Sequence, residues 1–241
     1  MRIPRLYTPQ PLATGQTIEL RDAPAHYLSR VLRLSPGRPV IVFNGEGGEF
    51  SGSLVSMDKK SVEVQLDEYS SFDRLPELTI ELAIGLSRGE RWDYVLQKAT
   101  ELGVSRIVPL LTERTEVKLK GERLQKKIDH WQQICISACE QCQRNRLPEI
   151  TEVTALEAYL PRAVGERKFV LHHRDSQKLA AGSAPASLSL LIGPEGGLSE
   201  TEIEIARRED FAPLTLGPRV LRTETAPTVA LSLVQYLWGD F

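Results

Sequence analysis

Apolar and polar residues follow two different rhythms along the chain. In the first part, short runs of β-forming residues alternate with turn signals such as Pro36-Gly37 and Asn44-Gly45. The predicted strands cover residues 5–7, 17–20, 39–43, 49–55 and 61–66, and one helix at about 24–34 interrupts them. This spacing predicts a small β-barrel-like module.

From residue 78 onward, predicted strands alternate with helices that carry an apolar face every 3.6 residues. The strands cover residues 78–86, 106–111, about 150, 168–172 and 188–192, and the helices cover 90–102, 121–144, 155–160 and 228–238. Gly103 ends the first of these helices, as a C-terminal glycine should. The alternation predicts an α/β domain with a mainly parallel sheet that is covered on both faces. A polar joint at 70–76 separates the parts, which gives two domains, 1–72 and 73–241.

Two loops rich in glycine and proline lie between residues 188 and 228. The first, Gly193-Pro194-Glu195-Gly196-Gly197, follows a strand that is almost wholly apolar, and it cannot continue the strand ladder. Ser199 and Glu202 form an S-x-x-E capping box, so a helix is predicted to start directly after it. The second loop covers residues 216–225, with Pro227 in the first turn of the final helix. Loops at the same ends of two strands predict a crevice for a small molecule.

Glycine alone does not separate such a crevice from two ordinary strand-to-helix turns. The charged side chains in the second loop, Arg219, Arg222 and Glu224, favour the functional interpretation. The other residues of the loop suit its backbone conformation, and charged residues on loops are concentrated at functional sites.

Composition narrows the class of protein. The 241 residues are 41% hydrophobic and 26% charged, with a net charge of -2, which is typical of a soluble globular protein and not of a generally basic nucleic-acid coat. No apolar run approaches the ~18 residues of a membrane span, and the first residues carry no apolar secretory core. Three cysteines form an odd, sparse set that fits the reducing cytoplasm.

Positive charge gathers at the N-terminus. Residues 1–38 hold six arginines against Glu19 and Asp22, a local charge of +4. Arginine binds phosphate oxygens in a bidentate manner, so Arg2, Arg5, Arg30 and Arg33 are candidates for an RNA-facing patch. Scattered surface charge explains the same excess, and charge alone leaves both interpretations open.

Two other signals carry weaker hypotheses. Cys135, Cys139 and Cys142 have the C-x3-C-x2-C spacing of radical enzymes that hold an iron–sulfur cluster, but the same spacing is one stripe of a helix. His172 and His173 end a strand, where neighbouring side chains point to opposite faces, so the pair cannot chelate one metal and one histidine is expected to face the crevice.

Several motifs resemble one known family. The two loops, the segment His26–Gly37, the segment Lys98–Val104 and the segment Ala138–Arg144 are similar to the signature regions of the ribosomal RNA small-subunit methyltransferase E (RsmE) family, in the SPOUT (trefoil-knot) class. The resemblance spans nearly the whole chain, although Arg88 stands where a lysine is usual.

The resemblance implies a trefoil-knotted, mainly parallel sheet with an N-terminal PUA-like domain. It implies a homodimer that binds S-adenosylmethionine and methylates N3 of one uridine in small-subunit ribosomal RNA, either naked or in the assembled 30S subunit. The cofactor residues it implies are Leu171, Ile192, Gly193, Pro194, Glu195, Gly196, Gly197, Leu216, Gly217, Val220, Leu221 and Thr225.

Methylation at N3 requires that the uridine lose a weakly acidic proton, so a base or a nearby positive charge must favour the anion. Arg222 is the candidate for that charge and Glu224 for the proton acceptor, with a structural ion pair between them as the alternative. Arg88, Arg114 and Arg219 are candidate RNA contacts. A non-catalytic assembly factor that binds ribosomal RNA and the radical enzyme remain alternatives.

The apolar pattern of the final helix predicts that it makes a further contact. Its apolar residues lie on almost every side, so the helix must be buried all round, either within this chain or against a second copy.

Overall fold

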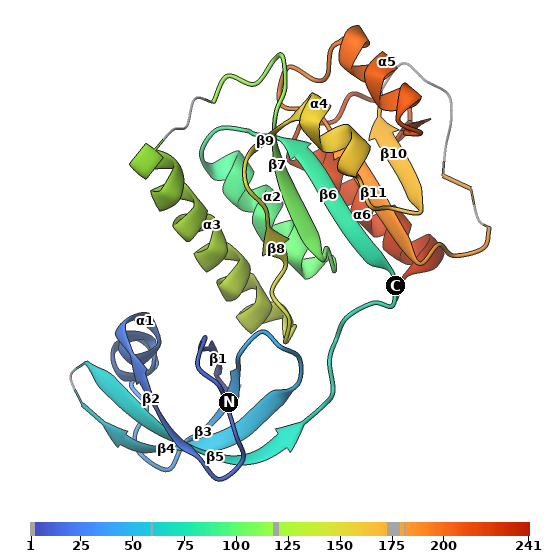
Figure 1. The fold of residues 1–241 in the computed structure, drawn as a ribbon. Coiled ribbons are helices and arrows are strands. Elements are labelled where there is room, and N and C mark those ends of the chain that lie inside the picture. Colours follow the sequence, from blue (N-terminus) through green and yellow to red (C-terminus); the bar gives the residue numbers. More distant parts are fainter. Residues whose placement is uncertain (1–2, 59, 118–120, 173–178, 181) are drawn as a thin grey trace. The chain divides into compact units, whose positions relative to one another are not determined.

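The computed structural model describes residues 3–58, 60–117, 121–172, 179–180 and 182–241 (Figure 1). The chain forms two compact units, and each unit is made of two separate segments of the sequence. The first contains Met1–Leu75 and Cys139–Leu147, and the second contains Pro76–Ala138 and Pro148–Phe241.

The first unit is built on a five-stranded sheet with the order β1-β3-β4-β5-β2. Its strands are β1 (Arg5–Tyr7), β2 (Thr17–Arg21), β3 (Pro39–Phe43), β4 (Glu49–Met57) and β5 (Ser61–Ser70). The pairing of β1 with β3 is parallel and the other pairs are antiparallel. Val62, Val64 and Leu66 alternate along β5 and are fully buried, so one face of the sheet forms the core. The predicted β module is present.

A short helix covers this core. It consists of α1 (Asp22–His26) and a π-helical turn, η1 (Tyr27–Val31), and it buries Ala25 and Leu28. The predicted helix ran to residue 34. The chain leaves the helix earlier because Arg33 takes the left-handed conformation (φ 50°), which ends an α-helix in the same way as a C-terminal glycine.

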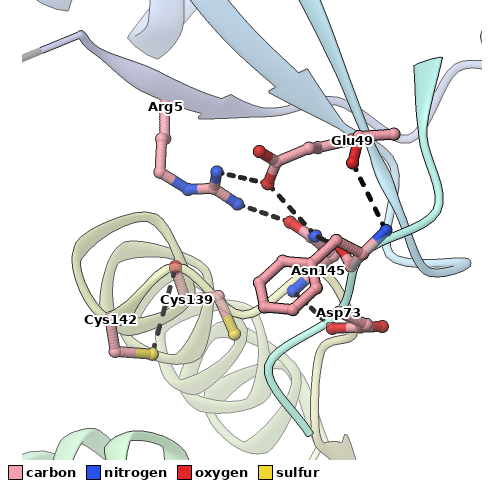
Figure 2. A network of polar contacts seen from close by, with 8 residues as sticks. Arg5, Glu49, Asp73, Cys139, Cys142 and Asn145 are labelled. Atoms are coloured by element: carbon pink, nitrogen blue, oxygen red, sulfur yellow. Dashed lines mark hydrogen bonds and ion pairs between the residues drawn. The ribbon is translucent and has the colours of Figure 1, made fainter.

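The segment Cys139–Leu147 returns to complete the first unit, although the sequence assigned it to the second domain. Figure 2 shows Asn145 between Arg5 and Glu49. The buried amide of Asn145 accepts a hydrogen bond from Arg5 and donates to Glu49 Oε2 (3.2 Å) and to the carbonyl of Phe72 (3.0 Å). Glu140 accepts the N–H of Tyr7 in β1 (3.0 Å). These contacts join distant parts of the sequence, which no local pattern predicts.

The second unit is built on a seven-stranded sheet in which every pair is parallel. The order is β12-β10-β11-β6-β7-β8, and β9 also pairs with β7. The strands are β6 (Thr79–Gly85), β7 (Arg106–Leu111), β8 (Glu149–Ile150), β9 (Thr154–Ala155), β10 (Arg167–Leu171), β11 (Ser187–Ile192) and β12 (Ala212–Leu214). The carboxyl ends of parallel strands meet at one edge, so β10, β11 and β12 bring three loop starts together there.

Helices cover both faces of this sheet, as predicted (Figure 1). On one face, α2 (Glu90–Glu101), α3 (Gly121–Cys142) and α6 (Thr225–Trp238) contribute Trp92, Trp131 and Leu231 to the core. On the other face, α4 (Leu156–Tyr159), η2 (Leu160–Arg162) and α5 (Glu200–Arg208) contribute to a second core that contains Ile203 and Phe211.

The predicted capping box is present at the start of α5. Ser199 Oγ accepts the N–H of Glu202 (3.2 Å), and Glu202 Oε2 accepts the N–H of Ser199 (2.8 Å). The final helix begins at Thr225, three residues before its predicted start, and Pro227 lies in its first turn. Proline has a backbone angle that suits the first turn of a helix, and it lacks only an N–H that would have no partner there.

Candidate functional site

The two glycine-rich loops enclose a cavity of about 270 Å³ at the carboxyl edge of the second unit's sheet. The first loop follows β11 and the second follows β12. The cavity is lined by Arg114, Leu171, His172, Ile192, Gly193, Pro194, Glu195, Gly196, Gly197, Leu198, Glu200, Ile203, Leu214, Leu216, Gly217, Arg219, Val220, Leu221, Thr223 and Ala226. The predicted crevice therefore exists, and side chains from both loops and three strand ends form its walls.

All of the predicted cofactor residues line this cavity except Thr225, the exposed first residue of α6. Sequence reasoning missed other parts of the wall, among them Leu214, Thr223 and Ala226. Leu214 could have been found, because the pattern indicates a short strand before the second loop. His172 lines the cavity, as expected for one histidine of the pair, whereas His173 lies outside the described residues.

The predicted catalytic residues lie between the cavity and α6. Neither Arg222 nor Glu224 lines the cavity, but their neighbours Leu221 and Thr223 do. The carbonyl of Arg222 accepts the N–H groups of Thr225 and Ala226 (both 2.9 Å), which fixes the backbone where α6 begins. The Arg222 side chain is exposed, and within the described ranges no ion pair joins it to Glu224. The structure thus does not contain the ion pair that was the alternative role for these side chains.

A second hollow adjoins the cavity. It is lined by Arg88, Arg91, Glu113, Arg114, Thr115, Glu116, Glu195 and Gly196. Arg114, Glu195 and Gly196 belong to both walls, so the two spaces share one rim. Arg88 pairs with Glu116 (3.0 Å) and Arg91 with Glu195 (3.6 Å), and both pairs are open to solvent. Exposed pairs of this kind contribute little to stability, so an anionic ligand can compete for both arginines.

Two of the N-terminal arginines predicted to contact RNA are exposed, and one is buried. Arg30 and Arg33 are exposed. Arg5 is only 7% exposed: its guanidinium pairs with Glu49 (2.6 Å), bonds Asn145, and lies 5.3 Å from the ring centre of Phe43 (Figure 2). The prediction that Arg5 contacts RNA is therefore wrong, because its charge is already neutralised inside the first unit. Arg2 lies outside the described residues.

The cysteines do not form a cluster site. Cys135 and Cys139 are buried along α3, and Cys142 is half-buried. Within the part of the chain that the structure describes, no group of three histidine, cysteine, aspartate or glutamate side chains could hold a metal ion. The positions of the three cysteines along α3 agree with the helical-stripe interpretation of their spacing.

Among the described residues, no helix combines the length and the apolar character that a membrane span requires.

Comparison with known proteins identifies the family. Residues 74–235 match the family described as an RNA methyltransferase domain, and residues 20–67 match an RNA methyltransferase PUA domain. The ribosomal RNA small subunit methyltransferase E of Bacillus subtilis is 34% identical, over 95% of this chain and 93% of that protein. The chain belongs to the ribosomal RNA small subunit methyltransferase E family.

Solved structures agree with this membership. The ribosomal RNA small subunit methyltransferase E of Neisseria gonorrhoeae, solved with S-adenosylmethionine, is 36% identical and has a TM-score of 0.93 with both chains fully covered. A methyltransferase structure from Legionella pneumophila, which contains the bound cofactor, is 40% identical with a TM-score of 0.96 over both whole chains. The family resemblance found in the sequence motifs is confirmed, and the protein is an RNA methyltransferase.

Proposed function

We propose that this protein uses S-adenosylmethionine to methylate N3 of one uridine in small-subunit ribosomal RNA. The observation that carries the proposal is the cavity between the two glycine-rich loops, with charged residues of the second loop directly beside it. The substrate named for the Bacillus subtilis relative supports ribosomal RNA of the small subunit as the acceptor.

The residues around the cavity fit an adenosine group. Leu171, Ile192 and Leu216 offer apolar surface to a flat base. The volume of the cavity, about 270 Å³, is close to the lower end of the usual range for ligand sites, about 300 Å³. Gly217 has φ 97°, and a Cβ atom there would meet no atom within 4 Å, so its backbone is open to close approach. These residues, with the 193–197 loop and Val220, Leu221 and Thr225 of the second loop, would hold the cofactor. When bound, S-adenosylmethionine supplies a methyl group on a positively charged sulfur.

Arg222 and Glu224 would act on the uridine. A guanidinium close to the base lowers the free energy of the N3 anion, since opposite charge favours the ionised form. Glu224 would accept the proton, which requires that it come within hydrogen-bonding reach of N3 or of a bridging water. The two hydrogen bonds that the Arg222 carbonyl accepts support this role, because they hold the backbone from which the side chain extends, and catalysis by charge depends on groups that are positioned before the reaction.

RNA would contact arginines in both units. Arg88 and Arg219 lie on the walls of the hollow and the cavity, and Arg30 and Arg33 are exposed on the first unit. Residues 1–72 would form the RNA-binding domain and 73–241 the catalytic domain, as the two family matches support. The match between 20–67 and a PUA domain favours this division over a purely structural first unit.

The exposed face of α6 supports a homodimer. Its inner side buries Ala230, Leu231, Val234 and Trp238, but Leu233 is 40% and Tyr236 72% exposed. Internal burial therefore accounts for only part of this apolar helix, and a second copy would cover the rest.

We also propose the trefoil knot of the SPOUT class for the second unit, and the cytoplasm, where ribosomal subunits are assembled, as the location.

The test is methylation of small ribosomal subunits, and separately of naked ribosomal RNA, from a strain that lacks the modification. The purified protein with labelled S-adenosylmethionine should yield 3-methyluridine on nucleoside analysis. A protein that binds the RNA but yields no methylated nucleoside would instead be the non-catalytic assembly factor.

A further inference from the structure

The turn that follows β7 is held in one shape by its own side chains. The N–H of Thr115 donates to the carbonyl of Thr112 (3.1 Å), and the N–H of Thr112 donates to Thr115 Oγ1 (3.0 Å). The two hydroxyl oxygens lie 3.0 Å apart and share a further hydrogen bond. This turn carries Arg114, so its backbone is a fixed point from which that side chain extends.

Side-chain hydrogen bonds connect this turn to the first glycine-rich loop and to the helix after it. Glu202 of the α5 capping box accepts the N–H of Glu113 (2.8 Å). Arg114 Nη1 donates to the carbonyl of Gly196 (2.8 Å) and, over a longer distance, to that of Leu198 (3.4 Å). Residues 193–198 form one wall of the cavity, so the Arg114 hydrogen bonds act on that wall, and the Glu202 hydrogen bond holds the start of the helix that follows it.

The stem of Arg114 also packs against the loop. A Cβ atom at Gly196 would lie 3.1 Å from Arg114 Cβ and 3.3 Å from Cδ, closer than most real contacts. A glycine at this position therefore lets the loop lie directly on the arginine. One nitrogen of the guanidinium, Nη1, makes both hydrogen bonds, and its partners are main-chain carbonyls of the loop rather than a carboxylate.

We propose that Arg114 is a positioning residue that holds loop 193–198 in the shape required for the cofactor, and not the RNA-phosphate contact that the sequence suggested. The inference rests on the proposed function, since it assumes that the cavity binds S-adenosylmethionine. A loop that is already ordered loses less conformational freedom when the ligand binds, so loss of the Arg114 hydrogen bonds should weaken binding. Lysine is an imperfect replacement, because its flexible stem and ammonium lack the fixed plane from which Arg114 Nη1 reaches the two carbonyls.

The test compares the full-length protein with Arg114→Ala, Arg114→Lys and, as the control, Arg123→Ala, which removes an exposed positive charge from α3. Calorimetry with S-adenosylmethionine in the absence of RNA should show Kd raised about tenfold or more in Arg114→Ala, because the loop then has to be ordered when the ligand binds. Arg114→Lys should lie between, and Arg123→Ala should match the wild type. Hydrogen exchange of residues 193–198 in the free protein should be faster in Arg114→Ala alone.

RNA affinity separates the two roles of Arg114. A positioning residue leaves the affinity for ribosomal RNA and its dependence on salt unchanged, whereas loss of a phosphate contact lowers the salt slope by about one. Unchanged cofactor binding in Arg114→Ala, or a lower salt slope with unchanged cofactor binding, would overturn the inference while leaving the proposed function intact. A wild-type protein that does not bind S-adenosylmethionine would overturn both.

Discussion

Neither Arg222 nor Glu224 forms an ion pair within the described part of the chain. Arg88, Arg91 and Glu195 are all paired with neighbours. Arg222 is exposed, and its main chain rather than its side chain contributes to the start of α6. A substitution of the Arg222 side chain should therefore change chemistry without changing the fold.

Replacement of Arg222 by alanine should lower the rate of methyl transfer about 100-fold or more, the usual loss when a group that stabilises a developing anion is removed. Single-turnover methylation of saturating RNA measures this rate. Cofactor affinity and melting temperature should match the wild type, since the side chain lines no part of the cavity. Turnover close to normal in this variant is incompatible with the proposed role.

Glu140 is a charged residue whose role is structural. Burial raises the pKa of its carboxyl above the ordinary value of 4.5, against the opposing effects of the Tyr7 N–H and of Arg5. The folded protein therefore binds this proton more tightly than the unfolded chain does. The resulting contribution to stability is fully present below pH 4.5 and is lost as the pH rises through the raised pKa.

Glu140→Gln should remove this dependence, because glutamine does not ionise and its carbonyl oxygen can still accept the N–H of Tyr7. The free energy of unfolding of the variant, relative to that of the wild type, should increase as the pH rises from 4.5 to 8. Urea titrations across that range measure the difference, with Glu204→Gln on the exposed face of α5 as the control. A difference that is constant with pH would contradict the assigned direction of the pKa.

Among the helices, α5 starts at the wall of the cavity and is held there by side-chain hydrogen bonds. Glu202 is 3% exposed, and its two oxygens serve different partners: Oε2 closes the capping box and Oε1 accepts the N–H of Glu113. Ser199 contributes only to the cap. The two members of one capping box therefore have unequal importance.

Ser199→Ala should lower the free energy of unfolding by about 1 kcal/mol, the usual loss of an N-cap. Glu202→Ala should lower it by about 2–4 kcal/mol, because it removes two hydrogen bonds to a charged group and leaves the buried N–H of Ser199 without an acceptor. Chemical denaturation measures both, and Glu204→Ala on the same helix is the matched control. Equal losses in the two variants would show that the contact with Glu113 adds nothing.

At the scale of the whole molecule, the apolar surface of α6 bears on the oligomeric state. Tyr236→Arg should convert a dimer to a monomer, since a charge placed in an apolar interface loses its hydration without gaining a partner. Sedimentation at micromolar concentration measures the change. Gln133→Arg, an exposed position on α3, should remain dimeric. A wild-type protein that sediments as a monomer would exclude the proposed dimer.

The local structure of this protein follows from the residues within each segment. Alternating strands and helices predicted the parallel sheet, because a strand buried on both faces must be apolar throughout. Gly193–Gly197, Ser199 and Glu202 predicted a loop followed by a capped helix, because these residues act on the backbone within a few positions. The motifs of the two loops were also sufficient to indicate the family, which the comparisons confirmed.

Contacts between residues that are distant in sequence are visible only in the folded molecule. It placed β11 between β10 and β6, which brings the two loops to one cavity, and it placed Arg5 beside Asn145 in the first unit. It also turned Arg114 toward the carbonyls of the first loop. Periodicity reports the face on which a residue lies but not the partner it faces. Strand order and the partners of charged side chains depend on how all the elements pack around the cores, and local periodicity does not contain this information.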